Sequence, residues 1–130
     1  MFSKTTNNIN ISVKPYYLEE QSKPDEQYYV WAYQVTINNL GKNTVQLKKR
    51  FWKITESNGL KKEVSGAGVI GEQPILYPGD KYEYTSGAPL STSSGFMEGY
   101  YEMQIINGDK FFVSVPLFSL DCPSSLNHLN

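Results

Sequence analysis

The chain has 130 residues, the length of one ordinary domain, with 12 basic and 13 acidic side chains. Because these charges nearly cancel, neither nucleic acid nor a membrane surface is expected as a partner. The single cysteine, Cys122, excludes an internal disulfide, and no stretch approaches the roughly 20 apolar residues that cross a bilayer. Residues 1–8 contain no apolar run typical of a signal peptide, so we expect a cytoplasmic protein.

Alternation of apolar and polar residues predicts short strands along most of the chain, and no window keeps a helical period for ten residues. The strongest strand pattern lies at residues 28–37, and a polar segment containing Pro24 predicts a loop at 19–26. The other predicted strands are residues 9–13, 45–56, 60–64, 75–77, 82–86, 101–105 and 111–115, the last of them ended by Pro116. Turns are predicted at residues 38–41, 57–59 and 78–80 and, as a type I′ turn, at 107–108.

The strand predicted at residues 45–56 changes phase along its length. Val45 and Leu47 lie in the register opposite to that of Trp52. One extra residue between Lys48 and Phe51 would restore the alternation, so we predict a β-bulge there.

Seven or eight short strands with frequent turns predict an all-β chain folded as an antiparallel β-sandwich. We expect one domain over residues 1–130, with a folded core at about 9–121 and a flexible tail at 122–130. The predicted core consists of Trp31, Tyr33, Val35, Trp52, Ile54, Met103, Ile105 and Val113.

Glycines at positions 66, 68 and 71 fit the spacing G-x-G-x-x-G, which binds phosphate when a helix follows it. Prolines after the stretch leave room for scarcely one helical turn, and no Lys-Ser or Lys-Thr pair follows as in a P-loop. The favoured interpretation is that the glycines let the backbone turn or a neighbour approach closely. The alternative is a nucleotide or pyrophosphate site formed by Gly66, Gly68, Gly71, Lys61 and Lys62.

Residues 85–95 are rich in small hydroxyl side chains and are predicted to be a loop at one end of the sandwich. Such loops are where sandwich folds usually place recognition surfaces, although an ordinary connection is the alternative. The candidate partner-binding residues are Thr85, Ser86, Gly87, Pro89, Ser91 and Thr92.

A basic run at residues 48–53 surrounds Phe51 and Trp52, the combination that a single-stranded nucleic acid could contact. Strand alternation would send successive side chains to opposite faces and split this cluster, so nucleic-acid binding is not favoured. If Arg50 shares the inward face with Trp52, it needs a buried acceptor or a path to solvent.

Residues for catalysis or metal binding do not form a recognisable pattern. Cys122 and His128 lie in the predicted tail, and no third group accompanies them. The carboxylates at 19–20 and 25–26 lack the spacing of a calcium-binding loop. We therefore expect no catalytic residues, no metal site and no cofactor.

Several separated stretches resemble the bacterial ApaG proteins in order, and the match extends from about Val13 to Asp121. The stretches are residues 15–17 (PYY), 29–33 (YVWAY), 50–52 (RFW), 66–74 (GAGVIGEQP), 84–90 (YTSGAPL), 97–101 (MEGYY) and 118–121 (FSLD). The resemblance implies an immunoglobulin or fibronectin type III-like antiparallel β-sandwich of seven to eight strands. It also implies a role linked to cobalt tolerance and magnesium efflux, and similar domains in eukaryotic proteins look like protein-interaction modules.

The glycine motif of the ApaG family has been proposed to bind pyrophosphate-containing nucleotides. Many relatives carry arginine at the position of Ser65, so this chain lacks the most plausible phosphate partner. By position, the resemblance implies a tyrosine corner at Tyr101, with its hydroxyl bonded to upstream backbone. We therefore expect a non-catalytic module that binds a protein, as a monomer or weak homodimer, with nucleotide binding as the alternative.

Overall fold

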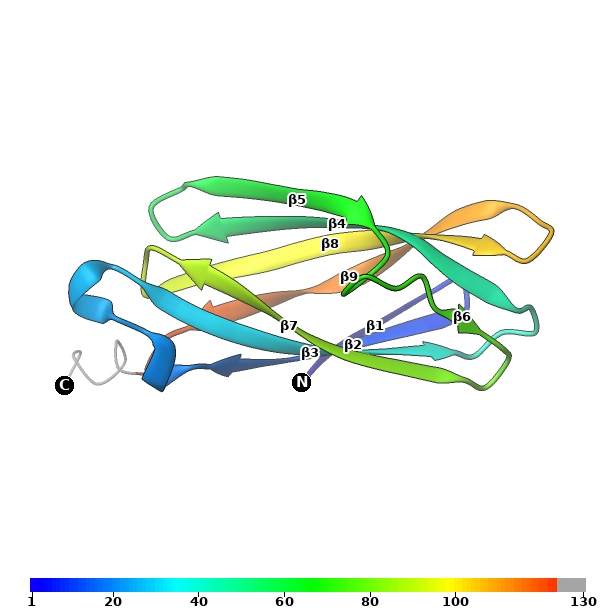
Figure 1. The fold of residues 1–130 in the computed structure, drawn as a ribbon, viewed down its shortest axis with the longest axis horizontal. Coiled ribbons are helices and arrows are strands. Elements are labelled where there is room, and N and C mark those ends of the chain that lie inside the picture. The colour runs from blue at the N-terminus through cyan, green and yellow to red at the C-terminus, as the bar shows by residue number, and fades with distance from the viewer. Residues whose placement is uncertain (124–130) are drawn as a thin grey trace.

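The structure, a computed structural model, describes residues 1–123 as a β-sandwich of two antiparallel sheets (Figure 1). The four-stranded sheet has the order β1 (Phe2–Thr6), β2 (Ile9–Tyr17), β3 (Tyr29–Asn39) and β7 (Lys81–Leu90). The five-stranded sheet has the order β5 (Lys61–Ala67), β4 (Val45–Glu56), β8 (Ser94–Ile105) and β9 (Lys110–Asp121), and β6 (Ile75–Leu76) also pairs with β4. Two 3₁₀ turns, η1 (Glu19–Gln21) and η2 (Pro24–Glu26), lie in the predicted loop between β2 and β3. The predicted antiparallel β-sandwich is confirmed.

The first strand, β1, is one that alternation does not predict. Phe2 is its only large apolar residue, and its ring packs against that of Phe118 with centroids 6.0 Å apart. The turn to β2 is formed by Asn7 and Asn8, whose φ angles of 50° and 63° are those that a two-residue type I′ turn needs. The folded region therefore begins before residue 9, the predicted start of the core.

Two β-bulges bend the five-stranded sheet. The pairing of β4 with β8 shifts between Leu47 and Lys49, so the extra residue is Lys48, at the first edge of the predicted interval. Pro116 does not end the last strand, and that prediction is wrong. One residue of β8 lies between Met97 and Gly99. The β9 residues that pair with these two are separated by two residues, Pro116 and its successor, so β9 has a bulge at this point. A bulge removes a position from the hydrogen-bond ladder, which is how a strand accommodates a residue without an N–H.

Three further predictions about connections are wrong. Residues 87–90 are not a loop but the end of β7, where they pair with β3, and only residues 91–93 connect β7 to β8. The turn at 107–108 is not type I′, because Asn107 has a φ of 60° but Gly108 is outside the left-handed region. Cys122 does not belong to a frayed tail, since it is buried and its N–H donates to the Ser93 carbonyl at 2.8 Å. Residues 124–130 of the predicted tail lie outside the described residues.

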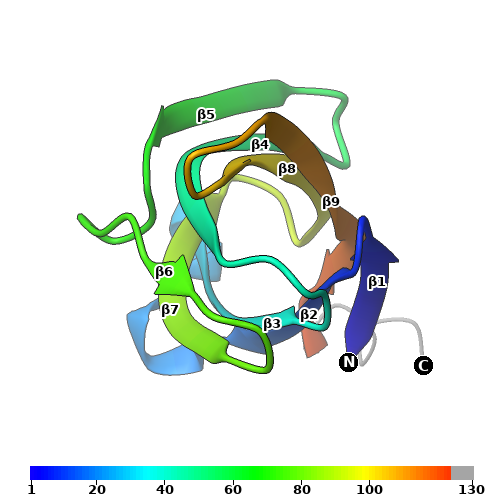
Figure 2. The ribbon, with the colours of Figure 1, turned by 90° about the vertical axis from the view of Figure 1, so that its right-hand side faces the viewer.

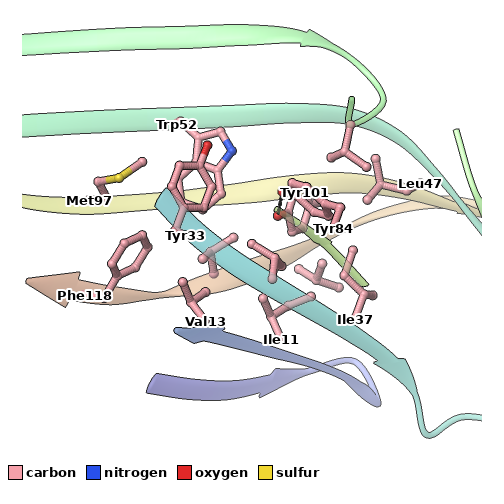
Figure 3. Close-up of a cluster of buried hydrophobic side chains, with 14 of the residues drawn as sticks. Ile11, Val13, Tyr33, Ile37, Leu47, Trp52, Tyr84, Met97, Tyr101 and Phe118 are labelled. Carbon is pink, nitrogen blue, oxygen red and sulfur yellow. Dashed lines mark hydrogen bonds between the residues drawn. The ribbon is translucent and has the colours of Figure 1, made fainter. Parts of the chain in front are cut away.

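The interior between the sheets is filled by aromatic and branched side chains (Figure 3). Of the eight predicted core residues, seven are buried and Ile105 is half-buried against them. Trp52 lies near the centre, with its ring 5.3 Å from that of Tyr33 and edge-on to that of Phe118 at 6.0 Å. Large rings that meet at these distances contribute beyond the apolar area they bury, so this cluster is a main source of stability.

The two edges of the sandwich differ. At one edge β1 lies against β9, where the Asn7 amide donates to the Phe112 carbonyl at 3.2 Å and the Ser114 N–H donates to the Thr6 hydroxyl at 3.4 Å. At the opposite edge β5 and β7 stand apart (Figure 2). The two strands at this second edge do not pair with each other, and the core side chains behind them are nevertheless buried.

Candidate binding surfaces

The glycine stretch supplies carbonyl groups, rather than amides, to its nearest cation. Gly66 pairs with Arg50 across β5 and β4, and a Cβ at Gly66 would lie only 3.1 Å from the Arg50 guanidinium nitrogens. The Nη1 group of Arg50 donates to the carbonyl of Ala67 at 3.1 Å and to that of Gly68 at 2.9 Å. The bare backbone at Gly66 therefore makes room for Arg50, whose acceptors are these two carbonyls.

The other two glycines form a tight turn after β5. Gly68 has a φ of 63°, and a Cβ there would lie 2.0 Å from the Glu72 carbonyl oxygen. The Gly68 N–H donates to the Lys48 carbonyl at 2.9 Å, so this amide is engaged by backbone. Ile70 and Gly71 take φ angles of 43° and 80° within a turn closed by two hydrogen bonds between residues 69 and 72. Both positive angles are those of a type I′ turn.

Lys61 and Lys62 lie at the start of β5, whereas Gly68 and Gly71 follow its end. Lys62 and Gly68 are six positions apart along extended chain, a span of roughly 20 Å. The structure thus does not bring the predicted phosphate-binding residues together, and nucleotide binding at this stretch stays a prediction.

The predicted partner-binding loop is mostly strand. Thr85, Ser86, Gly87 and Pro89 belong to β7 and pair with β3, while Ser91 and Thr92 lie in the short connection that follows. Both hydroxyls of this connection form local hydrogen bonds. The Ser91 hydroxyl and N–H donate to Oε1 of the buried Glu56, and the Thr92 hydroxyl donates to the Ser94 carbonyl at 2.7 Å. Recognition by these residues stays a prediction.

Tyr101 does not form a tyrosine corner with upstream backbone. Its hydroxyl shares a 2.5 Å hydrogen bond with the hydroxyl of Tyr84, which joins β8 of one sheet to β7 of the other (Figure 3). Burial raises the pKa of Tyr101 well above its ordinary value, and burial likewise raises that of Tyr84. Burial also raises the pKa of Tyr33, although a hydrogen bond with Ser86 acts in the opposite direction. These phenols are therefore neutral at physiological pH.

Exposed aromatic side chains gather on the outer face of the five-stranded sheet. Phe51 of β4 stacks on Tyr100 of β8 with centroids 4.5 Å apart and an interplanar angle of 17°, and Phe112 of β9 meets Tyr100 edge-on at 5.5 Å. Leu117 of β9 lines the same hollow as Phe51 and Tyr100, and Phe96 is exposed four residues before Tyr100 on the same face of β8. These five residues are called the outer aromatic patch below.

The outer aromatic patch borders a hollow of about 510 Å³ that lies across the sheet. Lys4 of β1 lines the hollow on one side and Glu63 of β5 on the other. Gly99 and Leu117 also line it, which places the β9 bulge in its wall. Sequence reasoning missed this surface. The pattern that could have indicated it is the presence of aromatic residues such as Tyr100 and Phe112 at strand positions that face outward and are usually polar.

A second, smaller hollow opens between the edges of β5 and β7 and is called the edge cleft below. Its volume is about 240 Å³, and buried Tyr33, Trp52 and Met97 form its floor. Arg50 and Lys62 line it from the five-stranded sheet, and residues of β7 line it from the other. The path to solvent that Arg50 requires is therefore this cleft.

Groups with catalytic or metal-binding chemistry lie apart. In the part of the chain that the structure describes, no group of three or more His, Cys, Asp or Glu residues is placed to hold a metal ion. Cys122 is buried, and His128 lies outside the described residues. The carboxylates at 19–20 and 25–26 are exposed on the two 3₁₀ turns. No helix within residues 1–123 is long and apolar enough to cross a membrane.

Two antiparallel sheets packed face to face define an all-β sandwich of the fibronectin type III-like class. The chain belongs to the ApaG family, since the family model of the ApaG domain matches residues 19–105. It is 56% identical to Protein ApaG of Parvibaculum lavamentivorans and 53% identical to that of Paramagnetospirillum magneticum, over 130 residues and the full length of both chains in each case. The crystal structure of the putative ApaA protein from Bordetella pertussis superposes with a TM-score of 0.86 at 45% identity, covering 88% of this chain and 94% of that one.

Proposed function

We propose that this chain is a non-catalytic module that binds a partner protein through the outer aromatic patch. The observation that supports this proposal is a set of five apolar side chains on one sheet face, four of them exposed and Phe51 half-buried, beside a hollow of about 510 Å³. Contiguous exposed apolar surface is uncommon on monomers and marks interaction sites. Aromatic residues are also the side chains most enriched at the centres of protein interfaces.

The surroundings of the patch favour a protein over a nucleic acid. Lys53 and Glu98 form an ion pair of 3.9 Å beside it, and Lys4 and Glu63 line opposite sides of the hollow. A surface with both charge signs offers no net attraction to phosphates, whereas a mixed polar rim around an apolar centre is typical of protein interfaces. Phe51 and Tyr100 stack on each other, so one face of each ring is already covered and cannot stack on a base.

The proposal includes the cellular setting that the family resemblance implies. We infer that the protein acts in the cytoplasm and that its effect on cobalt tolerance and magnesium efflux is exerted through the partner it binds. In that case a variant that loses the partner fails to restore cobalt tolerance to cells lacking the gene.

Capture from native lysate of the protein's own cells tests the proposal. Phe112→Glu places a charge in the outer aromatic patch, and Tyr16→Glu places the same charge on the outer face of the other sheet, where Tyr16 is comparably exposed. We expect the wild type and Tyr16→Glu to retain the same partner protein. Phe112→Glu should retain about ten-fold less of it, because a contact in the interface is lost. If both variants and the wild type retain the same proteins equally, the patch is not the binding surface.

A further inference from the structure

The edge cleft lies between two strands whose outer edges have no partner strand. Among residues 1–123, β7 pairs only with β3, and β5 pairs with β4 alone. The two edges stand apart at the open side of the sandwich (Figure 2). An unpaired strand edge offers a row of backbone donors and acceptors, which on β7 lacks a donor at Pro89, and an apolar hollow beside it can receive side chains. This combination is the one by which domains bind extended peptides through strand addition.

The charges that line the cleft have one sign. Arg50 and Lys62 are its charged residues, and no carboxylate lines it. A guanidinium has five N–H donors, and the hydrogen bonds of Arg50 to described residues come from Nη1 alone. Nε and Nη2 are therefore available for a planar acceptor, and a carboxylate fits that fork best. The electrostatic complement of the cleft is an acidic side chain.

The size and register of the cleft specify the ligand further. Its volume of about 240 Å³ is below the 300–1,000 Å³ usual for small-molecule pockets, and suits the side chains of a peptide. On β7, Ser86 and Ala88 face the interior, while Thr85 and Gly87 are exposed. A strand added beside β7 follows the same alternation, so two of its side chains that are two residues apart face the hollow together.

We propose that the edge cleft binds an extended acidic segment of a partner protein, by strand addition at the open side of the sandwich. In this segment a carboxylate side chain contacts Arg50 and Lys62, and a large apolar side chain two residues away packs on Trp52 and Met97. The site is separate from the outer aromatic patch, which lies on the opposite face of β4 and β8. It is an additional binding site and does not depend on the proposed role of that patch.

Titration of the full chain with synthetic peptides, followed by amide and arginine side-chain NMR signals, tests the proposal. The probe is Ac-Thr-Leu-Thr-Glu-Thr-Leu-Thr-NH₂, which places Glu two residues from Leu on either side, and its control replaces Glu by Gln. We expect the Glu peptide to bind with a Kd of roughly 1 mM or below and the Gln peptide about ten-fold more weakly. The shifted signals should lie in β5, β7 and the Arg50 side chain, and added salt should weaken binding.

Two lysines on β5 give a matched pair of variants. Lys62 lines the cleft, whereas Lys61 is the adjacent residue and points to the other face of the strand. We expect Lys62→Glu to weaken the Glu peptide by about five-fold and Lys61→Glu to leave its affinity within about two-fold. Phe112→Glu, in the outer aromatic patch, should also leave it unchanged. Arg50 itself donates to two backbone carbonyls, so replacing it could prevent folding. The two lysine variants test whether the peptide binds in the cleft without changing Arg50.

Several outcomes would overturn the proposal. Equal affinity for the Glu and Gln peptides would remove the acidic specificity, and so would equal effects of the two lysine variants. Absence of any shift at millimolar peptide, or shifts confined to the outer aromatic patch, would show that the cleft does not accept a strand. Shifts of β5 and β7 that depend on protein concentration without peptide would assign the cleft to a second copy of the chain instead.

Discussion

The two edges of the sandwich differ in whether the edge strands of the two sheets contact each other. At the β1–β9 edge, the strands meet and the ring of Phe2 covers that of Phe118, so side chains complete the core. At the β5–β7 edge, the strands stay apart, and the guanidinium of Arg50 is held by backbone carbonyls of the glycine stretch. The first edge is closed by contacts between apolar side chains. The second edge is open, and its structure depends on the backbone conformation of the glycine stretch.

This difference has a consequence for how each edge tolerates change. A closed edge depends on side-chain volume, because interiors are packed at high density. An open edge depends on a few backbone positions with special conformations, and its exposed side chains can vary at small cost. Binding surfaces can thus be placed at the open edge without weakening the core.

The largest expected effect is at the closed edge. Phe118 is fully buried and contacts the rings of Phe2, Tyr33 and Trp52. Phe118→Ala should lower the free energy of unfolding by about 3–5 kcal/mol, because it removes a large ring and leaves a cavity. Val64→Ala, at the open edge where Val64 is 44% exposed, should change it by less than about 1 kcal/mol. Urea unfolding of both variants measures the difference, and comparable losses would mean that the edges are not distinct.

Backbone control of the open edge predicts unequal effects at two glycines. A Cβ at Gly68 would overlap the Glu72 carbonyl, whereas nothing lies within 4 Å of a Cβ at Gly71, although both residues have a positive φ. Gly71→Ala should destabilise by about 1–2 kcal/mol through φ alone, and Gly68→Ala by at least about 2 kcal/mol more, because the turn must move. Thermal unfolding of the two variants tests this. A Gly68→Ala protein as stable as Gly71→Ala would contradict the close approach.

The edges also differ in how far sequence reasoning could predict them. Alternation located β4 at its observed limits, because buried and less buried residues alternate on both sides of the bulge in that strand. It missed β1, where Phe2 is the lone large apolar residue, and it ended β7 too early at Gly87 and Pro89, which usually mark turns. An edge strand tolerates a proline because its outer side needs no hydrogen bond, so turn signals are least reliable at sheet edges.

The candidate sites were harder to predict than the fold. Phe51, Tyr100 and Phe112 are far apart in sequence, and only the pairing of β4 with β8 and of β8 with β9 brings their rings together. For Arg50, alternation correctly raised the need for an acceptor or a path to solvent. The answer required the positions of the Ala67 and Gly68 carbonyls, which depend on backbone turns that residue types do not specify.

The smallest expected effect concerns the bond between the hydroxyls of Tyr84 and Tyr101, which joins the two sheets. Burial raises the pKa of both phenols above the ordinary value of 10.0, so the folded state retains protons that the unfolded chain releases. Their contribution to stability is therefore complete below pH 10 and is lost as the pH rises further. At pH 11 each tyrosine should favour unfolding by about 1 kcal/mol relative to pH 8.

The double variant Tyr84→Phe/Tyr101→Phe isolates this effect from every other group that titrates above pH 10. Replacing both partners leaves no hydroxyl unpaired, so at pH 8 its free energy of unfolding should lie within about 1 kcal/mol of the wild type. Between pH 8 and pH 11 it should lose about 2 kcal/mol less than the wild type, as measured by urea unfolding. The control replaces the exposed Tyr16 and Tyr77, which lie outside this pair, by Phe, and it should keep the wild-type pH dependence if the buried pair is the cause. Equal losses in the double variant and the wild type would mean that water reaches this pair from the open edge.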